Sequence, residues 1–174
     1  MAVPLYGAQA LEGFKPGDGV LRTIQTPFGT LSGIICNDTN HEEVVTQAGR
    51  NGTDILLSPS LEFREIDPIH AHMAIYRAIE NGVTLVRQAD NGLSFVVDPY
   101  GRVLAAVDHF TASERVMVAQ VPAKSGVFTV YPYIGDLLAW LAAVGFVALA
   151  VWAVVRGRKA RRAVSVQPEG QVAS

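Results

Sequence analysis

The sequence predicts a mixed α/β domain followed by one transmembrane helix. Two observations predict the domain: short apolar strands alternate with two helical stretches up to residue 82, and only strand-like stretches follow. A third observation predicts the membrane helix, because the 19 residues from Leu137 to Val155 carry no charge. The expected organisation is a domain over residues 1–130, a transmembrane helix over residues 131–156, and a basic, disordered cytoplasmic tail over residues 157–174.

The first half of the predicted domain contains three strands and one helix. Residues 20–26 and 30–38 are expected to form two strands around a Pro-Phe-Gly turn. A helix is expected over residues 41–52, because acidic residues stand in its first turn and glycines at its end. Residues 54–60 are expected to form a short, continuously apolar strand of the kind that is buried on both faces.

The second half begins with another helix and continues with strands. Residues 67–82 are expected to be helical, with Pro68 in the first turn and an Asn-Gly pair closing the helix. Asp-Asn-Gly and Asp-Pro-Tyr-Gly are strong turn signals in the stretch that follows. Four strands are therefore predicted, over residues 83–89, 93–101, 102–107 and 114–122.

A basic cluster after the apolar stretch predicts the orientation in the membrane. Residues 156–162 read RGRKARR, with five positive charges and no acid. Short loops rich in Lys and Arg stay in the cytoplasm, so the tail is expected inside and the domain outside the cytoplasm. The expected location is the cell membrane, with the lipid bilayer as a partner. The alternative for the apolar stretch is a buried helix of a soluble protein. The net charge of −2 suggests no nucleic-acid partner.

Cys36 is the only cysteine of the chain and stands between an apolar run and a polar stretch. A single cysteine forms no internal disulfide, so its thiol is either packed as a small apolar group or present for its chemistry. The residues alone leave both interpretations open. A metal site that combines Cys36 with Asp38 and the histidines is not favoured, because His70 and His72 are two residues apart on a helix and do not share a face. No metal and no cofactor are expected.

Two further features have ordinary structural explanations when each is taken alone. Arg77 and Glu80 stand three residues apart on the second helix, so they are expected to form a surface ion pair with a structural role. The stretch that holds Asn91 and Ser94 is expected to be a hairpin turn.

The order of four motifs carries a family resemblance that no single motif carries. GIICND, NGTDILLSPS, HMAIYRAIENG and LVRQADNGLSFVVDPYGRVLA follow one another as in the second half of a nitrilase-superfamily domain. The resemblance covers about residues 1–122 and points to the apolipoprotein N-acyltransferase branch of the carbon–nitrogen hydrolases. TVYPYIGDLLAWL also resembles the junction at which that branch enters its last transmembrane helix.

The resemblance implies the C-terminal part of a four-layer α-β-β-α sandwich and a Glu–Lys–Cys triad. Cys36 would form a thioester acyl-enzyme, with the glutamate as general base and the lysine stabilising the oxyanion. Asn37, Asp38, Asn91 and Ser94 are the expected residues of the substrate loops or the oxyanion side. The implied partners are a phospholipid acyl donor and a lipoprotein amine. A membrane-tethered amidase that acts on a small substrate is the alternative enzyme.

Two members of the implied triad have no counterpart in the sequence. AVPLYG, residues 2–7, resembles the family stretch that follows the lysine, so the lysine would fall at or before Met1 and the glutamate further upstream. The chain alone is therefore expected to be inactive, either as a piece of a larger membrane enzyme or as a degenerate, catalytically dead interaction domain. Asn37 and Asp38 stand where these acyltransferases usually carry an aromatic residue and a glutamate, which leaves the acyl donor and acceptor open.

Overall fold

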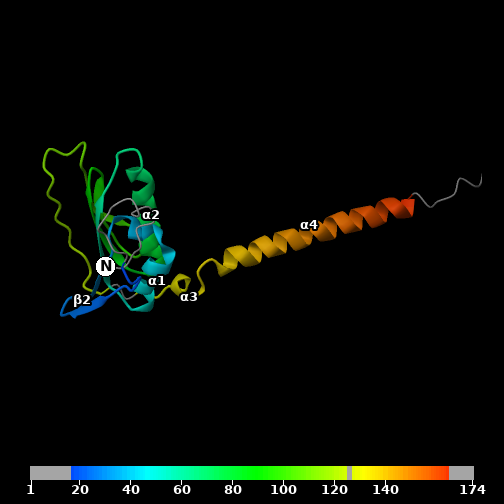
Figure 1. Ribbon diagram of the computed structural model, residues 1–174, viewed down its shortest axis with the longest axis horizontal. Coiled ribbons are helices and arrows are strands. Elements are labelled where there is room, and N and C mark those ends of the chain that lie inside the picture. Colours follow the sequence, from blue (N-terminus) through cyan, green and yellow to red (C-terminus); the bar gives the residue numbers. More distant parts are fainter. Residues whose placement is uncertain (1–16, 125–126, 165–174) are drawn as a thin grey trace, which may run out of the picture. The chain divides into compact units, whose positions relative to one another are not determined.

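The computed structural model describes residues 17–124 and 127–164. The chain divides into two compact units, Met1–Tyr133 and Ile134–Ser174. The described part of the first unit is a six-stranded mixed sheet with helices α1 and α2 on one face (Figure 1). The second unit is built on one long helix, α4 (Leu137–Val164). The AVPLYG stretch lies outside the described residues.

The six strands lie side by side in the order in which they occur in the sequence. They are β1 (Thr23–Thr26), β2 (Gly29–Gly33), β3 (Ile55–Leu61), β4 (Thr84–Asp90), β5 (Leu93–Val97) and β6 (Val103–Asp108). β2, β3 and β4 run parallel, whereas β1, β5 and β6 run antiparallel to the strands beside them in sequence. The carboxyl ends of β2, β3 and β4 therefore meet at one edge of the sheet.

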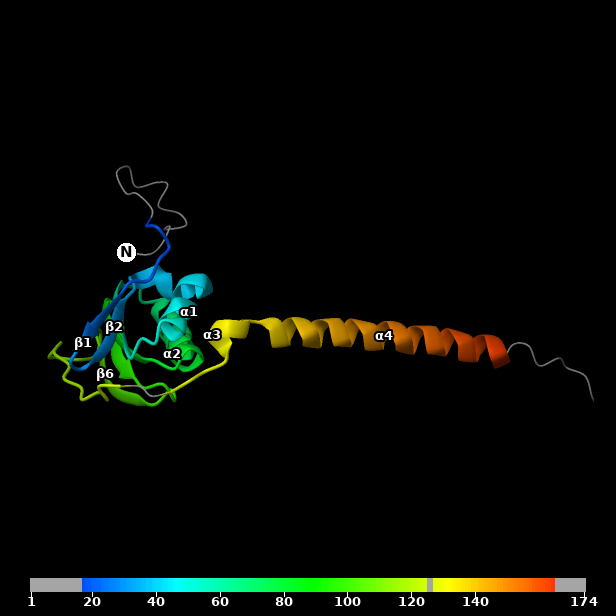
Figure 2. The same cartoon turned by 90° about the horizontal axis from the view of Figure 1, so that it is seen from below.

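The two predicted helices are confirmed, and each makes one of the parallel connections. α1 (Glu42–Arg50) joins β2 to β3, and α2 (Asp67–Asn81) joins β3 to β4. Such crossovers are almost always right-handed, so two of them that advance in the same direction place both helices on the same face (Figure 2). Gly82 ends α2 in the left-handed conformation, with φ of 65°, as the Asn-Gly pair predicts.

The core lies between this helix-covered face and the two helices. Alternate residues of the central strands point into it, because side chains along a strand alternate between the two faces. The buried apolar side chains of this cluster are Leu21, Ile34, Val44, Val45, Ala48, Leu56, Ala71, Ala74, Ala78, Val83, Leu85, Phe95 and Val97. Small alanines on α2 let this helix approach the sheet closely.

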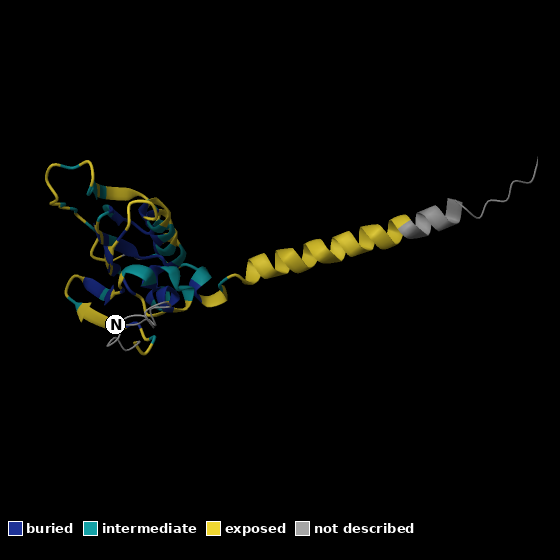
Figure 3. Cartoon of the chain, turned by 45° about the horizontal axis from the view of Figure 1, so that its top comes forward, coloured by how far each residue is buried: buried dark blue, intermediate teal, exposed yellow. Residues whose placement is uncertain are grey.

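The opposite face of the sheet is only partly covered (Figure 3). The strand predicted over residues 54–60 is confirmed as β3, but the expectation that both of its faces are buried is wrong. Leu57 is 42% exposed and Leu61 is 60% exposed, and Ile24 of β1 is 67% exposed. The apolar run alone predicted two-sided burial, whereas burial needs a second layer, and the described residues provide one on the helix side only.

The strand expected over residues 114–122 is not formed. This segment runs along the less covered face of the sheet (Figure 1). Val116 and Val118 are 79% and 86% exposed. Its alternating valines fit a strand, but a strand also needs a neighbour that pairs with its backbone groups. The carbonyl oxygen of Ala123 packs against Gly29 on β2, where a Cβ would come within 2.1 Å of it, so the segment is close to the sheet at its end.

The second unit contains the apolar stretch as a continuous helix. Leu137–Gly157 has a mean hydropathy of 2.4 and a length sufficient to cross a membrane, and none of it is buried in the structure. α4 continues to Val164, past the expected start of the disordered tail. Lys and Arg favour helix and suit a helix C-terminus, which explains why the helix extends into the basic cluster. Residues 165–174 lie outside the described part.

The turn between β5 and β6 is organised by the buried carboxylate of Asp98. It accepts the N–H groups of Tyr100 and Arg102, each at 2.9 Å, and the Nε–H of Arg102 at 2.6 Å. Burial by itself would raise the pKa of Asp98, but the hydrogen bonds from Arg102 and Tyr100 outweigh it and lower the pKa. The carboxylate thus accepts backbone N–H groups that have no backbone carbonyl as acceptor in a tight turn.

Asp98→Asn is expected to lower the free energy of unfolding by about 1 kcal/mol at neutral pH, because the amide loses the charge in these hydrogen bonds. A carboxyl group with a lowered pKa stabilises the fold above its ordinary pKa, and this contribution is lost as the pH falls through the folded-state pKa. The difference between wild type and variant should therefore shrink below about pH 4. Thermal unfolding of the full chain in detergent micelles measures it. Asp108→Asn is the control, because the carboxylate of Asp108 accepts the N–H of Phe110 at an exposed position. An equal loss of unfolding free energy in this variant would contradict the role assigned to Asp98.

Candidate active site

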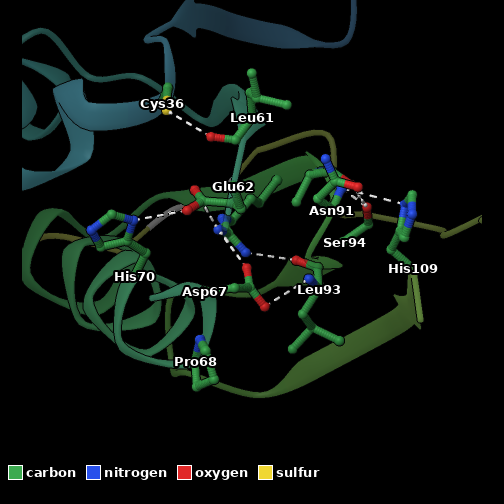
Figure 4. Close-up of polar contacts among 12 residues, drawn as sticks. Cys36, Leu61, Glu62, Asp67, Pro68, His70, Asn91, Leu93, Ser94 and His109 are labelled. Atoms are coloured by element: carbon green, nitrogen blue, oxygen red, sulfur yellow. Dashed lines mark hydrogen bonds and ion pairs between the residues drawn. The ribbon is translucent and has the colours of Figure 1, made fainter. Parts of the chain in front are cut away.

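Three polar groups follow the three parallel strands at the shared carboxyl edge of the sheet. Cys36 comes after β2, Glu62 comes directly after β3, and Asn91 comes directly after β4. Leu61 and Asp90 are register partners at the ends of β3 and β4, and the N–H of Glu62 donates to the carbonyl of Asp90 at 2.9 Å. The carboxyl edge is where open α/β sheets bind their ligands. We therefore treat this edge as the candidate site (Figure 4).

Cys36 stands on a strained turn. β2 ends at Gly33, earlier than the strand predicted to residue 38, although the N–H of Ile34 still donates to Leu57 at 2.9 Å. Cys36 opens the 3₁₀ helix η2 (Cys36–Asn40) with φ of 48°. A non-glycine residue in this region costs of order 1 kcal/mol or more, and such positions concentrate at functional sites. The Cys36 side chain is half-buried, and its thiol donates to the carbonyl oxygen of Leu61 at 3.4 Å.

The predicted residues Asn37 and Asp38 hold this turn. One carboxylate oxygen of Asp38 accepts the N–H of Ile35 at 3.0 Å, and the hydroxyl of Thr39 donates to the Cys36 carbonyl at 2.7 Å. Burial raises the pKa of Asp38, although the hydrogen bond from Ile35 and the nearby His41 favour its carboxylate. The side chain of Asn37 accepts from Asn40 at 2.8 Å. Asp38 is buried, so in this structure it supports the loop and does not present a group to solvent.

The predicted residues Asn91 and Ser94 lie in and beside the β4–β5 turn. Asn91 takes a positive φ of 57°, and its N–H contacts His109 at 3.3 Å. The Ser94 hydroxyl accepts the N–H of Ala89 at 3.0 Å and contacts the Ala89 carbonyl at 3.2 Å, which pins the hairpin. Ser94 also lines a cavity of about 300 Å³ on the less covered face, together with Val86, Gln88, Val107, Arg115 and Met117.

A buried charge cluster under this edge was not predicted from the sequence. Arg87, on the helix-covered face of β4, is 2% exposed and contacts two carboxylates, Glu62 at 2.7 Å and Asp67 at 2.9 Å. It also donates to the carbonyl of Leu93 at 2.7 Å, and Asp67 accepts the N–H of Leu93 at 2.9 Å. A charged residue inside the apolar strand 83–89 was the signal available in the sequence, because a buried charge requires partners.

His70 extends the cluster toward η2. Its Nδ1 lies 2.8 Å from the Glu62 carboxylate (Figure 4). Its Nε2 lies 3.5 Å from the side-chain nitrogen of Asn40. His72, on the same helix, is exposed and contacts only the carbonyl of Pro68 among its hydrogen bonds in the described part of the chain. Within the same described ranges, no three His, Cys, Asp or Glu side chains are grouped as a metal site requires.

The predicted pair of Arg77 and Glu80 forms, with 2.5 Å between the guanidinium and carboxylate atoms. It is less exposed than expected for a surface pair, at 17% and 27% of the two side chains. Burial lowers the pKa of Arg77, but Glu80 and a hydrogen bond with Tyr131 outweigh this effect and raise it. The pair lies on α2, away from the carboxyl edge, and its structural role stays a prediction.

Arg87→Met is expected to lower the free energy of unfolding by about 3–5 kcal/mol, because it leaves the carboxylates of Glu62 and Asp67 buried without a counter-charge. Thermal or urea unfolding of the full chain in detergent micelles checks this value. Arg102→Met removes a guanidinium that is 72% exposed and is the matched control, with an expected loss of no more than about 1 kcal/mol. Similar losses for the two variants would show that Arg87 is not an essential counter-charge.

Comparison with curated proteins finds apolipoprotein N-acyltransferases. The enzyme of that name from Bradyrhizobium diazoefficiens is 41% identical over 93 residues, which are 53% of this chain and 16% of that protein. The one from Vibrio vulnificus is 31% identical over 148 residues, 82% of this chain and 28% of that protein. This chain therefore spans well under a third of the length of these relatives.

Comparison with solved structures finds amidases of the nitrilase superfamily. One is a mutant of the amidase from Nesterenkonia sp. AN1 with the acetamide moiety of fluoroacetamide added covalently at its active-site cysteine. It has 26% identity and a TM-score of 0.57, over 62% of this chain and 44% of that one. A crystal structure of an amidase from Nesterenkonia sp. reaches a TM-score of 0.61 at 26% identity, over 72% and 50% of the two chains.

The carbon-nitrogen hydrolase family matches residues 7–127. This range includes every strand of the sheet, both helices on it, and the edge where Cys36, Glu62 and Asn91 lie. The order of motifs, the sheet and the relatives agree, and the chain belongs to the carbon-nitrogen hydrolase family.

Proposed function

We propose that this chain carries the nucleophile half of a cysteine-dependent acyl-transfer site, with Cys36 as the nucleophile. The observation that carries the proposal is the strained turn of Cys36, with φ of 48°, at the carboxyl edge between a parallel strand and a helix. The amidase structure with an acetamide moiety added covalently at its active-site cysteine supports cysteine chemistry on this fold.

The proposed reaction proceeds through a thioester. The Cys36 thiolate attacks the carbonyl carbon of an acyl ester; the ester C–O bond breaks, and the alcohol leaves with a proton from the general acid–base group. A primary amine then attacks the thioester carbonyl, the C–S bond breaks, an amide forms, and the amine proton passes to the same group. The backbone N–H that follows the nucleophile, that of Asn37, is the proposed local donor to the oxyanion.

The acyl donor is proposed to be a phospholipid and the acceptor a lipoprotein amine. Exposed apolar side chains on the segments that bracket Cys36 support a long acyl chain: Ile35 is 39%, Leu61 is 60% and Phe63 is 69% exposed. α4 independently supports a membrane setting, because Leu137–Gly157 is long and apolar enough to cross a bilayer. We propose that the domain faces the outside and the basic tail the cytoplasm.

The general base and the oxyanion lysine are proposed to come from a second sheet that completes a four-layer sandwich. The exposed apolar residues Ile24 and Leu57 of the sheet support this packing. So does the fact that the chain spans 16% and 28% of the length of two acyltransferase relatives. The chain by itself is therefore proposed to be inactive.

A chimera tests this function. Residues 7–127 of this chain replace the matching segment of the Bradyrhizobium diazoefficiens apolipoprotein N-acyltransferase, which supplies the remaining domain. The chimera is expected to transfer an acyl chain from phospholipid to a lipopeptide amine, and Cys36→Ala is expected to reduce this transfer by at least about 10³-fold. Mass spectrometry of the trapped intermediate should place the acyl group on Cys36. A folded chimera without transfer, or an active Cys36→Ala chimera, would contradict the proposal.

A membrane-tethered amidase is the second candidate, and the structural likeness to amidases favours it. The same chimera distinguishes the two candidates. Release of ammonia from short amides such as acetamide or butyramide, with no acyl transfer to the lipopeptide, would support the amidase.

A further inference from the structure

A chain of side-chain hydrogen bonds runs from the buried charge cluster to the turn of Cys36. The Glu62 carboxylate is bonded to Nδ1 of His70 at 2.8 Å, and Nε2 of His70 lies 3.5 Å from the amide nitrogen of Asn40. The same Asn40 nitrogen donates to the side-chain oxygen of Asn37 at 2.8 Å. Asn37 is the residue after Cys36, so this series of hydrogen bonds reaches the turn of the candidate nucleophile directly.

This arrangement determines which ring nitrogen of His70 carries the proton. The amide nitrogen of Asn40 has only donors, so Nε2 of His70 must accept and has no hydrogen. A carboxylate has only acceptors, so Nδ1 of His70 must donate to Glu62. With the amides in this orientation, a proton on Nδ1 and none on Nε2 satisfies both contacts of His70.

We propose that His70 is a positioning residue for Cys36. Its neutral Nδ1–H form fixes the side-chain amides of Asn40 and Asn37. A proton added at Nε2 rotates both amides by half a turn, so that their oxygen and nitrogen atoms exchange places. The importance of this role for catalysis rests on the proposed function of Cys36. The geometry that supports the role of His70 does not depend on that function.

The buried oxygen of Asn40 supports this second arrangement. Among the residues that the structure describes, this oxygen is buried and has no hydrogen-bond partner. A proton on Nε2 of His70 would face the donor nitrogen of Asn40, which is repulsive, whereas the turned amide would offer the oxygen as an acceptor. The turned Asn40 would then oppose the oxygen of Asn37, so Asn37 must turn too. Its nitrogen now contacts Nε2 of His41 at 3.2 Å, and the turned Asn37 would need a hydrogen there instead.

The charged groups around His70 come from four elements. Glu62 follows β3 and contacts the imidazole directly, while Arg87 on β4 and Asp67 on α2 contact one another behind it. Toward α1, the amide pair leads to His41, whose Nδ1 lies 3.5 Å from Glu43. Two carboxylates and one guanidinium in the inner cluster sum to −1. A proton on His70 would balance this charge, whereas the amide nitrogen of Asn40 on the Cys36 side would repel it.

The alkylation rate of Cys36 reports this coupling without requiring catalysis. Cys36 is the only cysteine, so iodoacetamide modifies one site in the chain. The full chain in detergent micelles is alkylated between pH 5 and 8, the range in which histidines titrate. The rate of wild type is divided by that of His70→Gln at each pH, which cancels the part of the pH dependence that the two proteins share. The glutamine side chain of this variant would donate to Glu62 and accept from Asn40 at every pH.

The ratio is expected to be about 1 at pH 8 and to fall roughly fivefold toward pH 5, about the effect of one hydrogen bond. His72→Gln, on the same helix but exposed, is the matched control, and the ratio of wild type to this variant should stay flat. A flat ratio for His70→Gln, or the same fall with both variants, would overturn the proposal.

A second measurement covers the case in which His70→Gln does not fold. The ¹⁵N shifts of the imidazole nitrogens of wild type distinguish the two neutral tautomers. The Nδ1–H form of His70 at pH 8, with side-chain amide signals of Asn37 and Asn40 that shift together as His70 titrates, is expected. An Nε2–H form, or amide signals that do not follow His70, would overturn the assignment. Either result is independent of acyl transfer, so it leaves the test of the proposed function separate.

Discussion

The buried guanidinium of Arg87 is the interaction on which the carboxyl edge of this sheet depends. It connects both ends of the β3–α2 connection, through Glu62 and Asp67, to Leu93 at the start of β5. A buried charge is tolerated only where its partners are fixed, so each of these segments must stay in place for the others to remain satisfied. Gly92 allows this closeness, because a Cβ there would lie 2.3 Å from an Asp67 oxygen.

The two faces of the sheet differ in how they are stabilised. On the helix side, alanines of α2 and valines of α1 pack against Leu56, Leu85 and Phe95, and Arg87 lies at the end of this layer. On the other side, apolar residues of the sheet remain exposed, and only the segment 109–124 runs across it in the described part of the chain. Large exposed apolar surfaces of this kind mark surfaces that pack against something else. The described residues therefore build the core on one face of the sheet, between it and the two helices.

The sequence predicted the elements whose boundaries have local chemical causes. Pro68 and the Asn81-Gly82 pair define α2 through fixed φ and a left-handed stop, and the Asp98 turn was predicted in the same way. The segment 114–122 was not predictable by this route, because a strand needs a partner and its alternating valines do not supply one. The Arg87 cluster was missed for a related reason: its members are up to 25 residues apart, and only the sheet register brings them together.

The position of Cys36 supports the proposal that its thiol is present for its chemistry. A cysteine that serves only as packing is buried among apolar atoms and needs no unusual backbone, whereas Cys36 is half-buried, has a φ of 48° and directs its sulfur to a backbone carbonyl. That contact suits the thiol, which donates its hydrogen to Leu61, but a carbonyl oxygen repels a thiolate. Ionisation of Cys36 therefore favours rotation of the sulfur away from Leu61. Thr39 and Asp38 hold the backbone of the turn and not the Cys36 side chain, so these hydrogen bonds do not depend on where the sulfur points.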